Sequence, residues 1–180
     1  MGRTIVLITG SPRKGGNSAK MADAFTQAAE SKGHTVQRID AAFMNVKGCM
    51  ACNRCYSNGK PCAVDNGFTE IGEKLEKADA IVFCTPVYWY TFPAQIKAVF
   101  DKMYSLAVGQ RVGEKECGLI GCCEEHDITV LDGLRIPYER SISLMKWKNM
   151  GEVLVPGVLN IGDIDNTDGC AQAAALAEKF

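Results

Sequence analysis

The feature that most constrains this chain is the segment of residues 4–18, TIVLITGSPRKGGNS. Its first part, residues 4–9, is a short apolar and β-branched run that is typical of a buried strand. The run ends at Gly10 and passes into small and basic residues, and a helical pattern of apolar residues follows from Ser18. The segment therefore predicts a strand, a tight loop and the start of a helix in immediate succession.

The loop has the composition of a phosphate-binding loop. Its glycines allow the backbone N–H groups to point inward, and the N-terminus of the following helix supplies partial positive charge. The side chains of Ser11, Asn17 and Ser18 can donate hydrogen bonds, and Arg13 or Lys14 can supply charge. The alternative is a Gly-rich connection between strand and helix that binds nothing.

Two common nucleotide-binding motifs are excluded by the loop sequence. The motif G-x-x-x-x-G-K-[ST] is absent, because Gly16 and Asn17 follow Gly15 where Lys and Ser/Thr are required. The motif G-x-G-x-x-G is absent as well, because Ser11 and Pro12 follow Gly10. ATP hydrolysis and a dinucleotide pocket at this first loop both lose support.

Strand-like and helical patterns alternate along the rest of the chain. Strands are expected at 35–39, 80–84, 115–121 and 152–155, and helices at 18–32, 67–77, 93–105, 128–148 and 168–180, the first with Ser18 as N-cap and Gly33 as C-cap. This alternation predicts βαβ units, a parallel sheet and helices on both faces. The loops 10–17, 85–92 and 121–127 then lie on one rim, where such sheets bind ligands.

Length and charge limit the class of protein. A chain of 180 residues predicts one domain, 1–180, and the net charge of −1 from 20 basic and 21 acidic residues does not suit a nucleic-acid binder. The sequence shows neither a membrane-spanning stretch nor a signal-peptide core, which predicts a cytoplasmic protein without membrane partners. In that reducing compartment the 9 cysteines are not expected to form disulfides.

The second and third rim loops offer aromatic and polar groups. Residues 85–93, TPVYWYTFP, carry Tyr88, Trp89, Tyr90 and Phe92, which are suited to stack on a planar ring or to pack under a helix or in a dimer interface. The third loop, residues 121–126, suits the polar edge of a ligand, and we interpret its His126 as structural.

These three loops together resemble the flavodoxin-like NAD(P)H-dependent FMN reductase superfamily. The matching segments are GSPRKGGNS, DAIVFCTPVYWYTFPAQIKAVFDK and ECGLIGCCEE, in order along essentially the whole chain. The resemblance implies a flavodoxin-like three-layer α/β sandwich, a five-stranded parallel sheet of order 2-1-3-4-5, bound FMN and a homodimer or homotetramer. FMN would take hydride from NAD(P)H and pass electrons to a small acceptor (a quinone, a nitro compound or another flavin), so no catalytic side chain is required.

The resemblance also assigns residues to the cofactor. The FMN phosphate would be held by Ser11, Arg13, Asn17 and Ser18, with Lys14 as a further candidate. The isoalloxazine ring would be flanked by Pro86, Val87, Tyr88 and Trp89, and Gly121 and Cys122 would approach it from the fourth strand.

A cysteine-rich insert is expected at about 47–66. Its spacing is Cys49-x2-Cys52-x2-Cys55-x6-Cys62, and cysteines two residues apart can converge on one cluster. The segment resembles that of the iron–sulfur flavoproteins, which implies a [4Fe–4S] cluster and, as an alternative function, electron transfer between partner redox proteins. Their last spacing is commonly one residue shorter, and other relatives keep similar cysteines without a cluster. A metal-free structural or redox thiol segment and a zinc site therefore stay open as well.

The remaining cysteines fall into two groups. Cys84 and Cys117 lie in apolar strands and are expected in the core. Cys122 and Cys123 lie at the rim, where they are candidates to respond to the redox state of a flavin.

Overall fold

The centre of the protein is a parallel sheet of five strands, seen in a computed structural model that describes residues 2–64, 67–109 and 111–180. The strand order is β2-β1-β3-β4-β5, and each pair of neighbours runs parallel. The strands are β1 (Thr4–Thr9), β2 (Thr35–Asp40), β3 (Ala80–Pro86), β4 (Glu116–Cys122) and β5 (Lys148–Val155). The predicted flavodoxin-like fold and strand order are confirmed.

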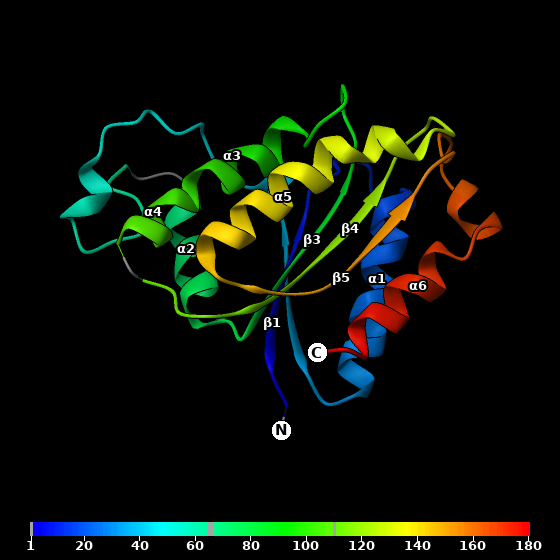
Figure 1. Cartoon of the computed structure of the whole chain (residues 1–180), viewed down its shortest axis with the longest axis horizontal. Coiled ribbons are helices and arrows are strands. Elements are labelled where there is room, and N and C mark those ends of the chain that lie inside the picture. The colour runs from blue at the N-terminus through cyan, green and yellow to red at the C-terminus, as the bar shows by residue number, and fades with distance from the viewer. Residues whose placement is uncertain (1, 65–66, 110) are drawn as a thin grey trace.

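Helices cover both faces of this sheet (Figure 1). One face carries α1 (Asn17–Ser31) and α6 (Gly169–Ala177), and the other carries α2 (Phe68–Lys77), α3 (Ala94–Lys102), α4 (Tyr104–Val108) and α5 (Asp132–Met145). Within the described ranges, no helix has the length and apolar character needed to cross a membrane.

The alternation of side chains along β1 explains why three layers form. Val6 and Ile8 pack against the α2–α5 side, whereas Ile5 and Leu7 pack against the α1–α6 side. All four side chains are fully buried, because successive residues of a strand point to opposite faces and both faces are covered.

Several element boundaries differ from the prediction. Ser18 is not the N-cap of the first helix, because α1 begins one residue earlier and Gly16 is the flanking residue. The helix expected at 93–105 is two helices, α3 and α4, and the one expected from 128 begins as a 3-10 turn, Ile128–Leu131. Lys146 takes a left-handed conformation, with φ of 56°, which ends α5 and lets β5 begin at Lys148.

Residues 44–64 form neither strand nor α-helix. Apart from a 3-10 turn at Arg54–Tyr56, this segment is irregular, and it extends along one side of the molecule beside α4 (Figure 1). Asp65 and Asn66, at the end of the predicted insert, lie outside the described residues. The insert boundary at about 47–66 therefore stays a prediction.

Candidate functional site

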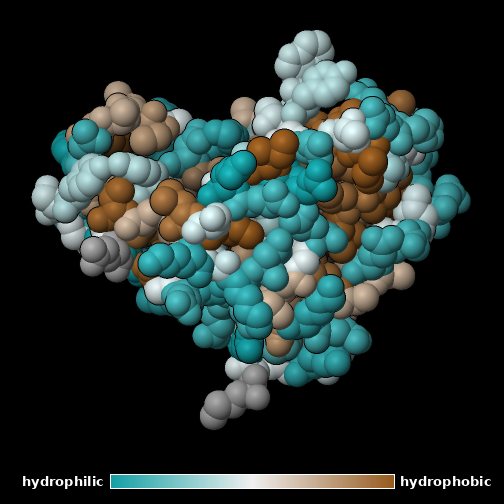
Figure 2. All heavy atoms as spheres, viewed as in Figure 1, coloured by the Kyte–Doolittle hydropathy of each residue, from teal (hydrophilic) through white to brown (hydrophobic). Residues whose placement is uncertain are grey.

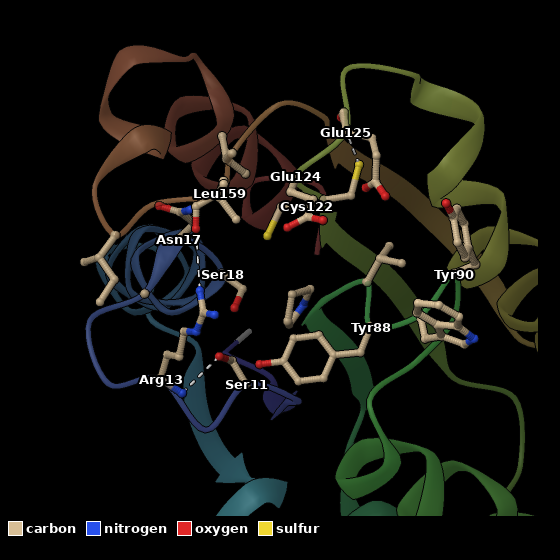
Figure 3. Close-up of a pocket in the computed structure, with 17 residues that line it drawn as sticks. Ser11, Arg13, Asn17, Ser18, Tyr88, Tyr90, Cys122, Glu124, Glu125 and Leu159 are labelled. Carbon is tan, nitrogen blue, oxygen red and sulfur yellow. Dashed lines mark hydrogen bonds between the residues drawn. The ribbon is translucent and has the colours of Figure 1, made fainter.

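The ends of three central strands bring the predicted loops together. Thr9 pairs with Cys84, and Pro86 pairs with Cys122, so β1, β3 and β4 end at the same edge of the sheet. The loops enclose a cavity of about 420 Å³, called here the rim pocket (Figure 3). It is lined by Ser11, Arg13, Gly16, Asn17, Ser18, Pro86, Val87, Tyr88, Trp89, Tyr90, Cys122, Cys123, Glu124, Glu125, Val158, Leu159 and Ile161.

One end of the rim pocket is a turn that leads into α1. Gly15 has a φ of +66°, and the turn closes through a hydrogen bond from the Gly16 N–H to the Arg13 carbonyl at 3.3 Å. No side chain caps α1, so the first N–H groups of a 15-residue helix lack a side-chain acceptor. Unpaired amides at a helix N-terminus suit a phosphate, so this end of the pocket fits the phosphate of FMN.

Arg13 and Lys14 are adjacent in sequence, but only Arg13 lines the rim pocket. Arg13 lines the rim pocket, and its guanidinium donates to the Leu159 carbonyl at 3.5 Å. The Lys14 ammonium lies 5.7 Å from the centre of the Phe43 ring, in a neighbouring pocket of about 400 Å³ that is also lined by Arg13 and Arg38. The structure therefore brings Arg13, but not Lys14, to the rim pocket.

The side chain of Asn17 is bound to a loop that the sequence analysis did not include. Its Oδ1 accepts hydrogen bonds from the backbone N–H groups of Gly162 and Ile164, at 3.1 and 3.3 Å. Its Nδ2 donates to the Asn160 carbonyl at 2.9 Å. Asn17 thus fastens the loop after β5 to the phosphate loop.

This fourth loop contributes Val158, Leu159 and Ile161 to the rim pocket. A signal for it was present, because β5 must end at the same edge as the other parallel strands. Gly157 and Gly162, both with positive φ, mark the turns of the loop.

The aromatic loop is a tight hairpin that divides its side chains among three environments. Tyr88 and Thr91 exchange backbone hydrogen bonds at 2.9 and 3.1 Å, and the ring of Tyr88 points into the rim pocket toward Ser11 (Figure 3). Trp89 and Tyr90, at the tip, are 92% and 60% exposed, and the hairpin projects from the molecule (Figure 2). Phe92 is buried and stacks on Phe100 at 5.1 Å.

A close approach to α5 holds this hairpin in place. Trp89 and Tyr90 both have left-handed backbone conformations, with φ of 47° and 62°. A Cβ atom at Gly133 would lie only 1.7 Å from the Tyr90 carbonyl oxygen, so only glycine allows this contact. The hydroxyl of Thr91 donates to the Gly133 carbonyl at 3.3 Å and completes the attachment.

At the end of β4, the pocket is formed by side chains after Gly121 rather than by Gly121 itself. The space beside its Cα is filled by Leu134 and Leu154, whose methyl groups would lie 2.9 and 3.1 Å from an added Cβ. Cys122, Glu124 and Glu125 line the pocket instead. The sequence analysis did not single out the two glutamates as pocket residues.

The rim cysteines are poor redox groups. Cys122 and Cys123 are buried on opposite sides of the sheet, in different core clusters. Burial raises the pKa of Cys122 to about 12, and the pKa of Cys123 is raised for the same reason. Neutral thiols are weak nucleophiles, which argues against thiol redox chemistry at this edge.

The expected core cysteines are confirmed. Cys84 and Cys117 are fully buried, and the Cys84 thiol donates to the Ser18 carbonyl at 3.1 Å. Burial raises the pKa of both thiols, to about 11 for Cys117.

The four cysteines of the insert line a second cavity, of about 310 Å³, called here the cysteine pocket. Cys49 and Cys52 are exposed, and Cys55 and Cys62 are partly buried. Across residues 2–64, 67–109 and 111–180, no three His, Cys, Asp or Glu side chains form a group that could hold a metal ion. A zinc site and a metal-free thiol segment stay open alternatives for these cysteines.

The donor set of the cysteine pocket does fit a larger group. A [4Fe–4S] cluster is bound by four thiolates around a body of several atoms, and four thiols around one cavity match that number and chemistry. Hydrogen bonds from the Arg54 backbone and side chain lower the pKa of the Cys52 thiol. The Tyr56 and Tyr104 hydroxyl groups bond to each other and join the segment to α4.

Comparison with known proteins gives a consistent picture. The family model described as NADPH-dependent FMN reductase matches residues 3–136. An iron–sulfur flavoprotein of Methanosarcina thermophila is 38% identical over 95 residues, which are 53% of this chain and 49% of the relative. One from Archaeoglobus fulgidus is 33% identical over 96 residues, 53% of this chain and 43% of the relative. The chain thus spans about half the length of these curated relatives.

Solved structures share the fold over nearly the whole chain. An NAD(P)H:quinone oxidoreductase from Methanothermobacter marburgensis has a TM-score of 0.73 at 19% identity, covering 98% of both chains. An azoreductase from Bacillus anthracis has a TM-score of 0.74 at 19% identity, covering 100% of both chains.

Proposed function

Because the chain belongs to the NADPH-dependent FMN reductase family, we propose that its rim pocket binds FMN and that it transfers electrons from NAD(P)H through the flavin to a small acceptor. Quinones, nitro compounds and free flavins are the acceptor classes that we propose. Membership of the family supports FMN as the cofactor and NAD(P)H as the electron donor, and the rim pocket is the cavity that we propose for them.

One observation supports this proposal: the rim pocket brings the N-terminus of α1 and aromatic side chains into a single cavity of about 420 Å³. The uncapped N-terminus of α1 suits the charged phosphate, and Tyr88 offers a flat aromatic face in the same cavity. FMN has the same division between an anionic tail and a planar ring. A plain strand-to-helix connection would not need this arrangement.

We therefore assign the following roles. Ser11, Arg13 and Ser18 hold the phosphate together with the N–H groups at the start of α1. Pro86, Val87, Tyr88 and Trp89 flank the ring, and Cys122 lies at its edge. Asn17 lines the pocket and also holds the loop after β5, whereas Lys14 and Gly121 do not line the rim pocket.

The flavin supplies the redox chemistry when bound, since it accepts hydride and releases one or two electrons. The protein residues bind and orient it and shield part of it from water. No side chain is required as nucleophile or general base.

A visible spectrum tests this function. Protein purified without oxygen should show the two flavin bands or bind added FMN, and NADH or NADPH should bleach those bands. Reoxidation by a quinone or a nitro compound should restore them. A colourless protein that does not bind added FMN would overturn the proposal.

A second candidate function is electron transfer between partner redox proteins, with FMN and a [4Fe–4S] cluster in the same chain. Four cysteines that share one pocket favour it, as do relatives named iron–sulfur flavoproteins. Iron and sulfide analysis separates the two candidates. About four irons per chain support the cluster, and rapid steady-state NAD(P)H turnover supports the reductase.

We also propose that residues 1–180 form a single domain that works in the cytoplasm as a homodimer or homotetramer. The family resemblance supports this assembly, and so does the hairpin tip, because Trp89 is 92% exposed beside the rim pocket. The mass of the assembly by light scattering tests it.

A further inference from the structure

A buried lysine lies at the cysteine pocket. Lys102, the last residue of α3, is only 5% exposed and lines this pocket. Its ammonium lies 3.5 Å from the Cys62 Sγ and 6.0 Å from the centre of the Phe68 ring. The structure thus buries the Lys102 side chain with its amino group beside a sulfur atom and an aromatic face.

No carboxylate compensates this charge within the part of the chain that the structure describes. The ion pairs found there leave Lys102 out. Asp101 lines the same pocket, but its carboxylate pairs with Lys97 and not with Lys102. A neutral thiol and an aromatic ring are weak partners for a desolvated ammonium. Burying a charge without an anion is costly, so this arrangement points to negative charge in the pocket itself.

The thiols of the pocket can provide that negative charge. Cysteine binds metals as the thiolate, and four thiolates around a [4Fe–4S] cluster leave the whole group anionic. Lys102 lies beside the partly buried Cys62, whereas Cys49 and Cys52 are exposed to water. The cation is therefore at the protein-facing end of the pocket, where solvent screens it least.

We propose that Lys102 is a positioning residue that compensates the charge of an anionic thiolate-bound cluster held by Cys49, Cys52, Cys55 and Cys62. This inference rests on the second candidate function and not on the FMN site. One-electron reduction adds a negative charge to such a group, and a buried cation nearby stabilises the reduced form more than the oxidised one. Lys102 therefore raises the midpoint potential of the group and strengthens its retention.

The test compares the full chain with three variants after anaerobic reconstitution with ferrous iron and sulfide. Lys102→Met keeps the aliphatic stem and removes the charge, and Lys102→Arg keeps the charge. Lys47→Met is the matched control, because Lys47 lines the same pocket but is exposed. The readouts are iron and sulfide per chain, the rate of iron loss to a chelator, and the midpoint potential from a redox titration followed by electron paramagnetic resonance.

We expect Lys102→Met to lower the midpoint potential and to lose iron several-fold faster than the wild type. Lys102→Arg should restore most of both properties, and Lys47→Met should change them less than Lys102→Met does. Equal potential and equal iron retention in Lys102→Met would overturn the inference. So would a wild-type chain that retains no iron after reconstitution.

Two further measurements keep the result interpretable. Lys102→Gln, which also lacks the charge, replaces Lys102→Met if the latter does not fold. FMN binding, read from the visible bands of each variant, reports on the rim pocket alone. A wild-type chain that binds no FMN would overturn the proposed flavin site. Intact flavin bands together with an unchanged potential and iron retention in Lys102→Met would overturn only the role of Lys102.

Discussion

The rim pocket is enclosed by backbone turns from four loops, whereas the cysteine pocket is enclosed by one irregular segment against α3 and α4. In the rim pocket, hydrogen bonds fix the walls, such as those from Gly162 and Ile164 to Asn17. In the cysteine pocket, the wall is an irregular segment without strand or α-helix among its described residues, and the buried Lys102 lies beside Cys62.

The difference teaches where each site obtains its geometry. Strand ends and turns define the rim pocket without help from a ligand, because the sheet register positions them. Thiols on an irregular segment have no such frame, so a bound metal group would itself set their positions. The rim pocket should therefore respond to local packing changes, and the cysteine pocket to changes in thiol chemistry and charge.

Thiol reactivity should separate the two pockets by the largest factor. In metal-free protein at pH 8, Cys52 should be alkylated faster than Cys122 by on the order of a thousandfold, because the thiolate is the reacting form. Burial raises the pKa of Cys122 to about 12, whereas hydrogen bonds from Arg54 lower the pKa of Cys52. Timed alkylation followed by peptide mass analysis measures both rates.

The alkylation rates of Cys122 and Cys52 should depend on pH in different ways. Raising the pH from 8 to 10 should increase the labelling of Cys122 steadily, because its thiol stays protonated until about pH 12. The labelling of Cys52 should level off within the same range. Similar rates for the two cysteines would mean that the rim pocket opens to solvent far more than its packing suggests.

Of the two adjacent basic residues before α1, Arg13 should contribute more than Lys14 to the affinity for FMN. Arg13→Ala should weaken FMN binding by about 2 kcal/mol, because a hydrogen bond to a charged group is worth about 1.5–3 kcal/mol. Lys14→Ala is the matched control and should change the affinity by less than about 0.5 kcal/mol, since Lys14 lies over Phe43. Fluorescence titration of FMN measures both, and an equal loss in the two variants would contradict the assignment.

Gly133 tests how firmly the aromatic hairpin is held. Gly133→Ala should lower the free energy of unfolding by about 1–3 kcal/mol, because its Cβ would lie 1.7 Å from the Tyr90 carbonyl oxygen. Gly113→Ala is the control, since nothing lies within 4 Å of its added Cβ. Urea unfolding measures the stability of both variants. A Gly133→Ala protein as stable as wild type would show that the hairpin can shift freely.

The smallest expected effect concerns Asn17, whose side chain joins the first loop to the loop after β5 by hydrogen bonds. Asn17→Ala removes three hydrogen bonds to residues 160–164 and should cost about 1–2 kcal/mol of stability. Asn17→Asp keeps the two bonds that Oδ1 accepts and should recover part of this loss. Hydrogen exchange at Gly162 and Ile164 is the direct measurement. Unchanged protection in Asn17→Ala would contradict the role of Asn17 in holding the loop after β5. Asn17 would then remain a predicted phosphate contact.

Local patterns were sufficient for the fold and for most of the rim. Buried strands such as Ala80–Pro86 form continuous apolar runs, and the alternation of strands and helices leaves a parallel sheet as the consistent arrangement. Helix ends were less predictable. Ser18 is a good N-cap by residue type, yet the turn at Gly15 and Gly16 starts α1 before it.

The sequence by itself determined the order of elements, the carboxyl-edge position of the loops and the concentration of thiols in one insert, because these depend on periodicity and spacing along the chain. Only the tertiary structure decided that Asn17 binds a turn 145 residues away, that Lys14 turns to Phe43 and that Lys102 is buried at Cys62. A helical pattern would place Lys102 in water. Its burial depends on an irregular segment 40 residues earlier in the chain folding over α3, which no local pattern encodes.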